Sequence, residues 1–262
     1  MKRNSPTILN VAFNGLVDAS AHYDPTQAPM FWDSRVLGLE AQALAPIESL
    51  EEMRGGQVTP GGGVADAVAR VAAVPEYQEL FRGAFGEADA VNALNLSRAI
   101  AAFERSLVTA DSPFDRYLRG DTSALNATEL YGMAAFDKQG CTLCHKGPML
   151  SDYQVHVLGV PDNRALGAPD PGAGQRFAFR TPTLRNLAYT APYMHGGTID
   201  YVDTVVADFY RRPGGPRVDP LLQQVAVEFN AHDITAFLAT LNGTFDRSIP
   251  PRVPSGLPPG GR

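Results

Sequence analysis

The two cysteines of this 262-residue chain lie in the segment Cys141-Thr142-Leu143-Cys144-His145. Two thiols that bracket two residues, followed directly by a histidine, have the spacing for covalent attachment of c-type haem. The thiols bond the vinyl groups, and the imidazole binds the iron from one face. A structural zinc site usually needs four protein ligands, and the sequence has no second cysteine pair. The pattern therefore favours haem c over the alternatives of a redox dithiol, a zinc half-site or a disulfide.

Composition limits the remaining classes of function. Hydrophobic residues make up 44% of the chain and charged residues 19%, as in a water-soluble globular protein. The net charge of -6 argues against nonspecific nucleic-acid binding, which basic surfaces drive. No apolar run approaches the roughly 18–20 residues that span a bilayer. Lys2 and Arg3 precede no apolar signal segment, yet haem c is attached outside the cytoplasmic membrane. We therefore expect a periplasmic protein whose leader was removed or whose chain starts late.

The elements that must position the motif are predicted to be helices. Asn126 and Glu129 form a capping-box pattern for a helix that runs into the haem motif. Asn230 is the predicted N-cap of the last helix. Pro113 is expected to stop the helix predicted over residues 88–108. Apolar periodicity predicts helices over residues 64–74, 75–85, 88–108, 198–211, 220–229 and 231–241.

No segment alternates convincingly, so we predict an all-α fold with a boundary near residues 109–125. One helical domain covers residues 1–110, a second covers 111–245, and a Pro/Gly-rich tail over 246–262 is predicted to be disordered.

Several sequence blocks, in a fixed order over about residues 3–242, resemble the bacterial di-haem cytochrome c peroxidases. That family includes the methylamine-utilisation enzyme, which matures tryptophan tryptophylquinone. The blocks are residues 31–35 (FWDSR), 39–43 (LEAQA), 46, 52–53, 101–107 (AAFERSL), 112–117 (SPFDRY), the haem motif with Gly147-Pro148, 180–186 (RTPTLRN) and 191–197 (APYMHGG).

The resemblance implies two cytochrome-c-like helical haem domains and a catalytic role for three residues. Glu52 matches the acidic residue that moves a proton as the peroxide bond breaks, although alone it would be interpreted as a solvated carboxylate. Gln42 matches a polar residue of the same pocket. Trp32, the only tryptophan, matches the aromatic bridge between the haems. Arg185 and Arg180 are candidates to pair with haem propionates, where a guanidinium fits a carboxylate.

The second axial ligand of the iron stays open between two side chains. The electron-transfer peroxidases use a methionine on the helix after the His-Gly loop, and the methylamine-utilisation branch uses a tyrosine. Tyr210 lies at about that position, and Met194 is the reserve candidate. His195 is expected to make a structural hydrogen bond, whereas His22, His156 and His232 are interpreted as solvated or structural.

The family also implies a calcium ion, whose ligands match the Asn4 side chain and the backbone carbonyls of Thr190 and Pro192. Oxygen donors of this kind suit a hard cation.

The chain departs from the family because it has one haem motif where the family has two. We expect a truncated chain that lacks the first motif and whose N-terminal haem domain is incomplete. Ser34, where the family usually has glycine, is a smaller departure, tolerable if that turn needs no positive φ.

The resemblance implies a peroxidase that reduces hydrogen peroxide with electrons from a small c-type cytochrome or a cupredoxin. A homodimer would agree with it. Two alternatives remain: an enzyme that oxidises protein side chains, and a mono-haem electron carrier.

Overall fold

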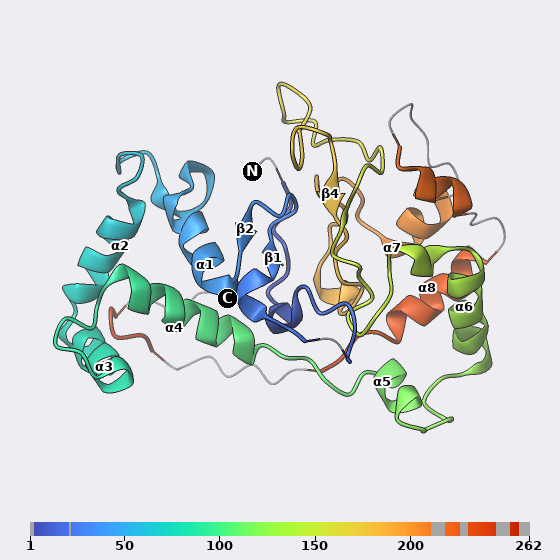
Figure 1. Cartoon of the computed structure of the whole chain (residues 1–262), viewed down its shortest axis with the longest axis horizontal. Coiled ribbons are helices and arrows are strands. Elements are labelled where there is room, and N and C mark those ends of the chain that lie inside the picture. The colour runs from blue at the N-terminus through green and yellow to red at the C-terminus, as the bar shows by residue number, and fades with distance from the viewer. Residues whose placement is uncertain (1–2, 21, 211–217, 226–229, 245–251, 257–262) are drawn as a thin grey trace. The chain divides into compact units, whose positions relative to one another are not determined.

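The computed structural model describes residues 3–20, 22–210, 218–225, 230–244 and 252–256 (Figure 1). The chain divides into two compact units. The haem-motif unit comprises Met1–Leu37 and Leu107–Phe245, and the helical unit comprises Gly38–Ser106 and Asp246–Arg262. The second junction, between residues 106 and 107, lies just before the boundary expected near residues 109–125. The N-terminal segment up to Leu37 groups with the C-terminal part of the chain rather than with residues 38–106. Most of the predicted tail lies outside the described residues.

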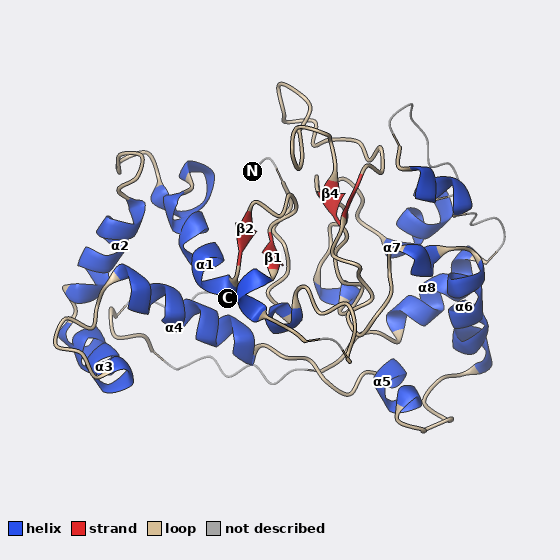
Figure 2. Cartoon of the chain, in the orientation of Figure 1, coloured by secondary structure: helices blue, strands red, loops and turns tan. Residues whose placement is uncertain are grey.

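The chain is mostly helical, as predicted, with short strands added (Figure 2). Strands β1 and β2 pair antiparallel, as do β3 and β4. Each strand has two residues, too few to show alternation in the sequence. The elements of the haem-motif unit are β1 (Pro29–Met30), β2 (Val36–Leu37), α5 (Pro113–Leu118), α6 (Ala127–Lys138), β3 (Val155–His156), β4 (Phe179–Arg180), α7 (Val202–Thr204) and α8 (Ala231–Ala239).

Reciprocal capping starts two of these helices. Asn126 and Glu129 form the predicted capping box of α6, with Asn126 Oδ1 accepting from the Glu129 amide at 3.1 Å. A second box, between Ser112 and Asp115, starts α5. The sequence prediction treated Pro113 only as a helix stop. It also begins a helix, because proline at the first helical position loses no hydrogen bond.

Other predicted helices differ in length or in their caps. The segment over 198–211 gives only α7 and a π-helix, Val205–Phe209. The segment over 220–229 gives a 3₁₀ helix, Pro220–Gln224, and residues 226–229 lie outside the described residues. Helix α8 begins where predicted, but the Asn230 side chain does not cap it. Its Oδ1 instead accepts from Gln139 Nε2 at 2.9 Å, which ties α8 to the end of α6.

The core of the haem-motif unit lies where α6 crosses α8. Phe237 is 2% exposed, and its ring packs against Phe114 and Phe136 with both ring centroids 5.4 Å away. Gly132 faces the backbone of α8, and a Cβ there would overlap the carbonyl oxygen of Asp233. Only glycine therefore permits this helix crossing.

A buried polar network holds the N-terminal segment in the same unit. Thr109 Oγ1 accepts hydrogen bonds from the side-chain amides of Asn10 and Asn186, each at 2.7 Å. The Thr109 amide donates to Asn10 Oδ1 at 2.8 Å. Arg3 adds a two-pronged ion pair with Asp170, at 2.6 and 2.7 Å. These contacts explain why residues 1–37 do not belong to the helical unit.

The helical unit is built on α1 packed against α4 (Figure 1). Ala101 of α4 is fully buried, and Arg105 forms a two-pronged ion pair with Glu40 of α1 at 2.6 and 2.8 Å. Its helices are α1 (Leu39–Glu48), α2 (Gly63–Ala72), α3 (Pro75–Phe85) and α4 (Ala93–Ser106), with a π-helix at Leu50–Arg54. Helix α1 was not predicted, and α4 starts later than the predicted residue 88.

Ser34 adopts φ 53° at the turn between β1 and β2, so this turn does require the left-handed region. Among the described residues, no helix combines the length and the apolar character that a bilayer-spanning segment needs.

The Gly132 contact predicts a specific destabilisation. Gly132→Ala should lower the free energy of unfolding by about 3 kcal/mol, because the added methyl group forces α6 and α8 apart. Gly83→Ala, in α3, is the matched control, since nothing lies within 4 Å of a Cβ there. It should stabilise by about 0.5–1 kcal/mol through helix propensity. Denaturant unfolding of both variants checks this, and a Gly132→Ala variant as stable as Gly83→Ala would contradict it.

Candidate functional site

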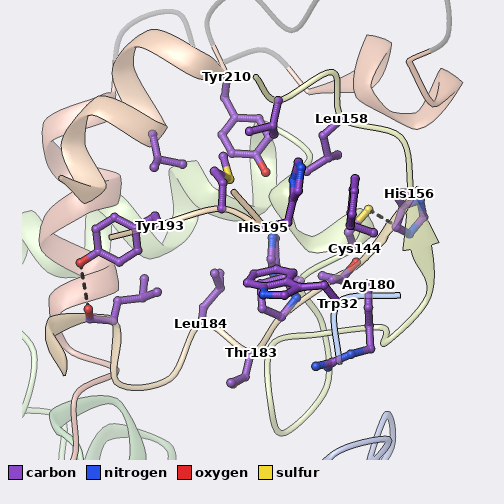
Figure 3. A pocket seen from close by; sticks show the side chains of 18 of the residues that line it. Trp32, Cys144, His156, Leu158, Arg180, Thr183, Leu184, Tyr193, His195 and Tyr210 are labelled. Carbon is purple, nitrogen blue, oxygen red and sulfur yellow. Dashed lines mark hydrogen bonds between the residues drawn. The ribbon is translucent and has the colours of Figure 1, made fainter. Parts of the chain in front are cut away.

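A cavity of about 650 Å³ lies within the haem-motif unit, lined mainly by apolar side chains (Figure 3). The haem motif contributes Cys141, Cys144 and His145 to its lining. The N-terminal segment contributes Trp32, and the end of the π-helix contributes Tyr210. The structure thus brings together side chains from both ends of this unit's sequence.

The motif follows directly on α6. Gly140 takes φ 85° and turns the chain into a short 3₁₀ helix, Cys141–Leu143. Both thiols are free, and burial raises the pKa of the Cys141 thiol to about 11. His145 Nδ1 lies 3.0 Å from the carbonyl oxygen of Leu150 and donates to it, which leaves the Nε2 lone pair available to a metal. Burial lowers the pKa of His145, so the imidazole is held in the neutral form that binds metals.

Both candidates for the second axial ligand line this cavity. The phenol of Tyr210 points into it (Figure 3), and burial raises the pKa of that phenol above its ordinary value. Met194 lines the same cavity from the loop that leads into Gly196-Gly197. The geometry therefore keeps Tyr210 and Met194 both available.

The two arginines predicted to meet haem propionates have different surroundings. Arg185 is engaged, because its guanidinium pairs with Asp115 at 3.0 Å and donates to the Pro148 carbonyl oxygen at 2.8 Å. Arg180 is 6% exposed and lines the cavity, where its Nε donates to the Phe31 carbonyl oxygen at 3.0 Å. No carboxylate of the described residues pairs with it, and desolvation lowers its pKa. A buried cation of this kind calls for an anion.

Trp32 is fixed beside the predicted calcium ligands. Its Nε1 donates to the Asn4 carbonyl oxygen at 2.8 Å. The Asn4 side-chain amide donates to the Pro192 carbonyl oxygen at 2.5 Å, and the Asn4 backbone amide donates to the His195 carbonyl oxygen at 2.7 Å. Thr190 lines the same cavity. The structure therefore places Asn4 and Pro192 in contact.

The other two residues predicted to be catalytic belong to the helical unit. Glu52 is exposed on the π-helix Leu50–Arg54. Gln42 lies on α1, and its Oε1 is buried without a hydrogen-bond partner among the described residues. This unpaired acceptor can therefore take a hydrogen bond from a donor other than the described residues, such as a bound molecule.

Two histidines have more specific partners than the sequence indicated. His195 is buried, its Nε2 pairs with Asp162 Oδ1 at 3.2 Å, and its ring stacks on Phe179 with the centroids 3.6 Å apart. The expected structural hydrogen bond of His195 is therefore present. His156, left as solvated or structural, is buried against Asp152 and Asp219. Asp152 lies four residues before His156, a spacing that carried a weak signal, but Asp219 is 63 residues away.

Together these side chains fit a c-type haem. The cavity is apolar, and it holds two free thiols and a neutral imidazole with one nitrogen available. Its wall carries a buried guanidinium that no carboxylate in the described part of the chain pairs with. A porphyrin needs an apolar cavity, its vinyl groups need the thiols, and its propionates need cations.

Comparison with known proteins also relates the chain to haem proteins. The family model for di-haem cytochrome c peroxidase matches residues 1–123. The methylamine utilization protein MauG of Methylorubrum extorquens is 33% identical to the chain over 262 residues, which cover 97% of this chain and 68% of that protein. The cytochrome c551 peroxidase of Pseudomonas aeruginosa is 35% identical, with the same shares covered.

Solved structures agree with this. The crystal structure of a MauG-like protein associated with microbial copper homeostasis matches with a TM-score of 0.72 and 27% identity. The match covers 93% of this chain and 76% of that protein. The diheme peroxidase BthA of Burkholderia thailandensis has the same fold over 82% of this chain and 66% of its own, with a TM-score of 0.64 and 22% identity.

Proposed function

Because the chain belongs to the di-haem cytochrome c peroxidase family, whose members are oxidoreductases that act on peroxide, we propose that it takes part in hydrogen peroxide reduction. Electrons would come from a small c-type cytochrome or a cupredoxin. Haem c would be bound at Cys141, Cys144 and His145. The observation that carries the proposal is the apolar cavity lined by both free thiols and by the His145 imidazole, which the Leu150 carbonyl already orients.

Each side chain of this site has a definite task. Bound haem would supply an iron that accepts single electrons from the donor and passes them on. The Leu150 carbonyl fixes the tautomer and the orientation of His145, and the hydrogen bond raises the basicity of Nε2. The indole of Trp32, held by Asn4, would conduct electrons out of this site.

Proton handling is assigned to the helical unit. Glu52 would accept a proton from one peroxide oxygen and return it to the other, the work of a general acid–base group. Its exposure leaves the carboxylate accessible to a small substrate. Gln42, whose Oε1 has no hydrogen-bond partner in the described part of the chain, would accept a hydrogen bond from bound peroxide or water.

Calcium would bind at the Asn4 side chain and the backbone carbonyls of Thr190 and Pro192, which line one cavity and offer oxygen donors. The Asn4 side-chain amide donates to the Pro192 carbonyl oxygen, so a bound cation would replace that hydrogen bond. We also infer a periplasmic location, because haem c is attached outside the cytoplasmic membrane, and cell fractionation checks it. A homodimer would agree with the family and is checked by sedimentation.

Oxidation of protein side chains is the second candidate function. The tyrosine in the cavity and the similarity to a methylamine utilization protein favour it. A mono-haem electron carrier is the third, because these 262 residues contain two cysteines, enough for one covalent attachment.

Protein isolated from its native source tests the proposal. Intact mass and the haemochrome spectrum count the covalent haem, elemental analysis counts iron and calcium, and peroxide consumption is followed with a reduced c-type cytochrome. Glu52→Gln should lower kcat roughly 100-fold or more, because the proton relay is lost. Glu51→Gln is the matched control and should leave kcat unchanged. Absence of covalent haem, or equal rates in both variants, would refute the corresponding part of the proposal.

The second axial ligand is tested by spectroscopy. Tyr210→Phe should abolish the phenolate-to-iron band of the ferric protein, because the variant has no oxygen to bind the metal. Met194→Leu should leave the ferric spectrum unchanged. The reverse outcome would identify Met194 as the ligand.

The Arg180 environment gives a stability prediction. In the haem-loaded protein, Arg180→Gln should lower the free energy of unfolding by about 3–5 kcal/mol, because a buried propionate loses its counter-charge. Arg180→Lys keeps the charge and should recover most of that loss. Denaturant unfolding followed by haem absorbance measures both, and equal losses in the two variants would exclude the propionate pairing.

A further inference from the structure

A cluster of charged side chains lies beside the second haem-attachment thiol. His156 Nε2 is 3.8 Å from the Sγ of Cys144 (Figure 3) and 3.0 Å from Asp152 Oδ2. His156 Nδ1 is 2.7 Å from Asp219 Oδ2. The proposed function uses none of these three charged groups.

The geometry settles the charge of this cluster. A carboxylate accepts hydrogen bonds, so an imidazole held between two carboxylates must carry a proton on each nitrogen. The hydrogen bonds to Asp152 and then to Asp219 raise the pKa of His156, and both remain when Cys144 is bonded to haem. One imidazolium and two carboxylates leave one net negative charge.

Backbone hydrogen bonds hold the charges in place. The Asp152 amide donates to the Cys144 carbonyl oxygen at 2.8 Å, and the Asp219 amide donates to the Val157 carbonyl oxygen at 2.9 Å. The side chains of His156 and Asp152 are each 10% exposed and that of Asp219 is 23% exposed. Because these three charged groups are partly shielded from water, their electrostatic field is screened less than that of surface charges.

We propose that Asp152, His156 and Asp219 form a fixed triad of net negative charge that lowers the reduction potential of the haem attached through Cys144. The inference rests on the proposed function, since it requires haem c in the cavity. Ferric haem carries one more positive charge than ferrous haem, so a nearby negative charge stabilises the ferric state. The three residues act as positioning and electrostatic groups and do not bind the iron.

A metal-binding role for the same residues is weaker. Cys144, Asp152 and His156 offer ligand atoms that lie within 4.8 Å of one another. Thioether formation at Cys144 removes the thiolate that such a site would use. In the haem-loaded protein, the three groups therefore remain an electrostatic triad.

Potentiometric titration of the haem-loaded protein at pH 7 tests the triad by the sign of the shift. Asp219→Asn removes a negative charge and should raise the midpoint potential. His156→Gln removes the positive charge and should lower it. Asp121→Asn, an exposed carboxylate in the turn before α6, is the control and should leave the potential unchanged. Structural disruption alone would move the first two variants in the same direction.

Asp152→Asn provides a second carboxylate removal if His156→Gln fails to load haem, and it should raise the potential as Asp219→Asn does. Shifts of the same sign in Asp219→Asn and His156→Gln, or none in either carboxylate variant, would overturn the triad and leave the proposed function standing. A wild-type protein without covalent haem would refute the proposed function as well, and the haemochrome spectrum separates the two failures.

Discussion

The close crossing of α6 and α8 is the constraint on which the haem-motif unit depends. Gly132 allows the two helices to meet at backbone contact, and the rings of Phe136 and Phe237 fill the space beside the crossing. The haem motif begins just beyond the end of α6, so the crossing fixes where the thiols lie. The π-helix Val205–Phe209, which Tyr210 follows, packs on α8 through Val206 in the same core cluster. The contact between α6 and α8 therefore positions both the thiols and the π-helix next to Tyr210.

The N-terminal segment completes the cavity because buried polar groups require partners. Thr109 satisfies Asn10 and Asn186 at once, and leaving any of them unpaired in the interior would cost about 1–3 kcal/mol. This network places residues 3–32 against the C-terminal part of the unit, where Asn4 supports Trp32. The hydrogen bonds that these buried polar groups require therefore also position Trp32, the aromatic side chain proposed to conduct electrons.

Electrostatics divides the cavity into regions with different preferences. Arg180 presents a buried positive charge that lacks a carboxylate partner within the described ranges, which suits an anionic substituent of the porphyrin. The triad at His156 presents net negative charge near the Cys144 sulfur. Such an arrangement would orient an asymmetric cofactor, with its propionates toward Arg180 and one vinyl group toward Cys144. It would also favour the ferric state of the iron.

The sequence by itself determined what depends on covalent spacing and on local hydrogen bonds. The segment from Cys141 to His145 specified the attachment chemistry, and the capping box of Asn126 and Glu129 marked the start of α6. The mainly helical content of the chain was also predicted, from the periodicity of its apolar residues. The short strands and the loss of the Asn230 cap were not, because each depends on contacts with distant residues. The start of α5 is encoded locally, by Ser112, Pro113 and Asp115, but the sequence prediction treated Pro113 only as a helix stop. Tertiary structure alone decided that Arg185 pairs with Asp115 while Arg180 has no carboxylate partner among the residues that the structure describes. It also decided that His156 pairs with Asp219 across 63 positions. Charge pairing is a property of distance in space, and sequence separation does not report it.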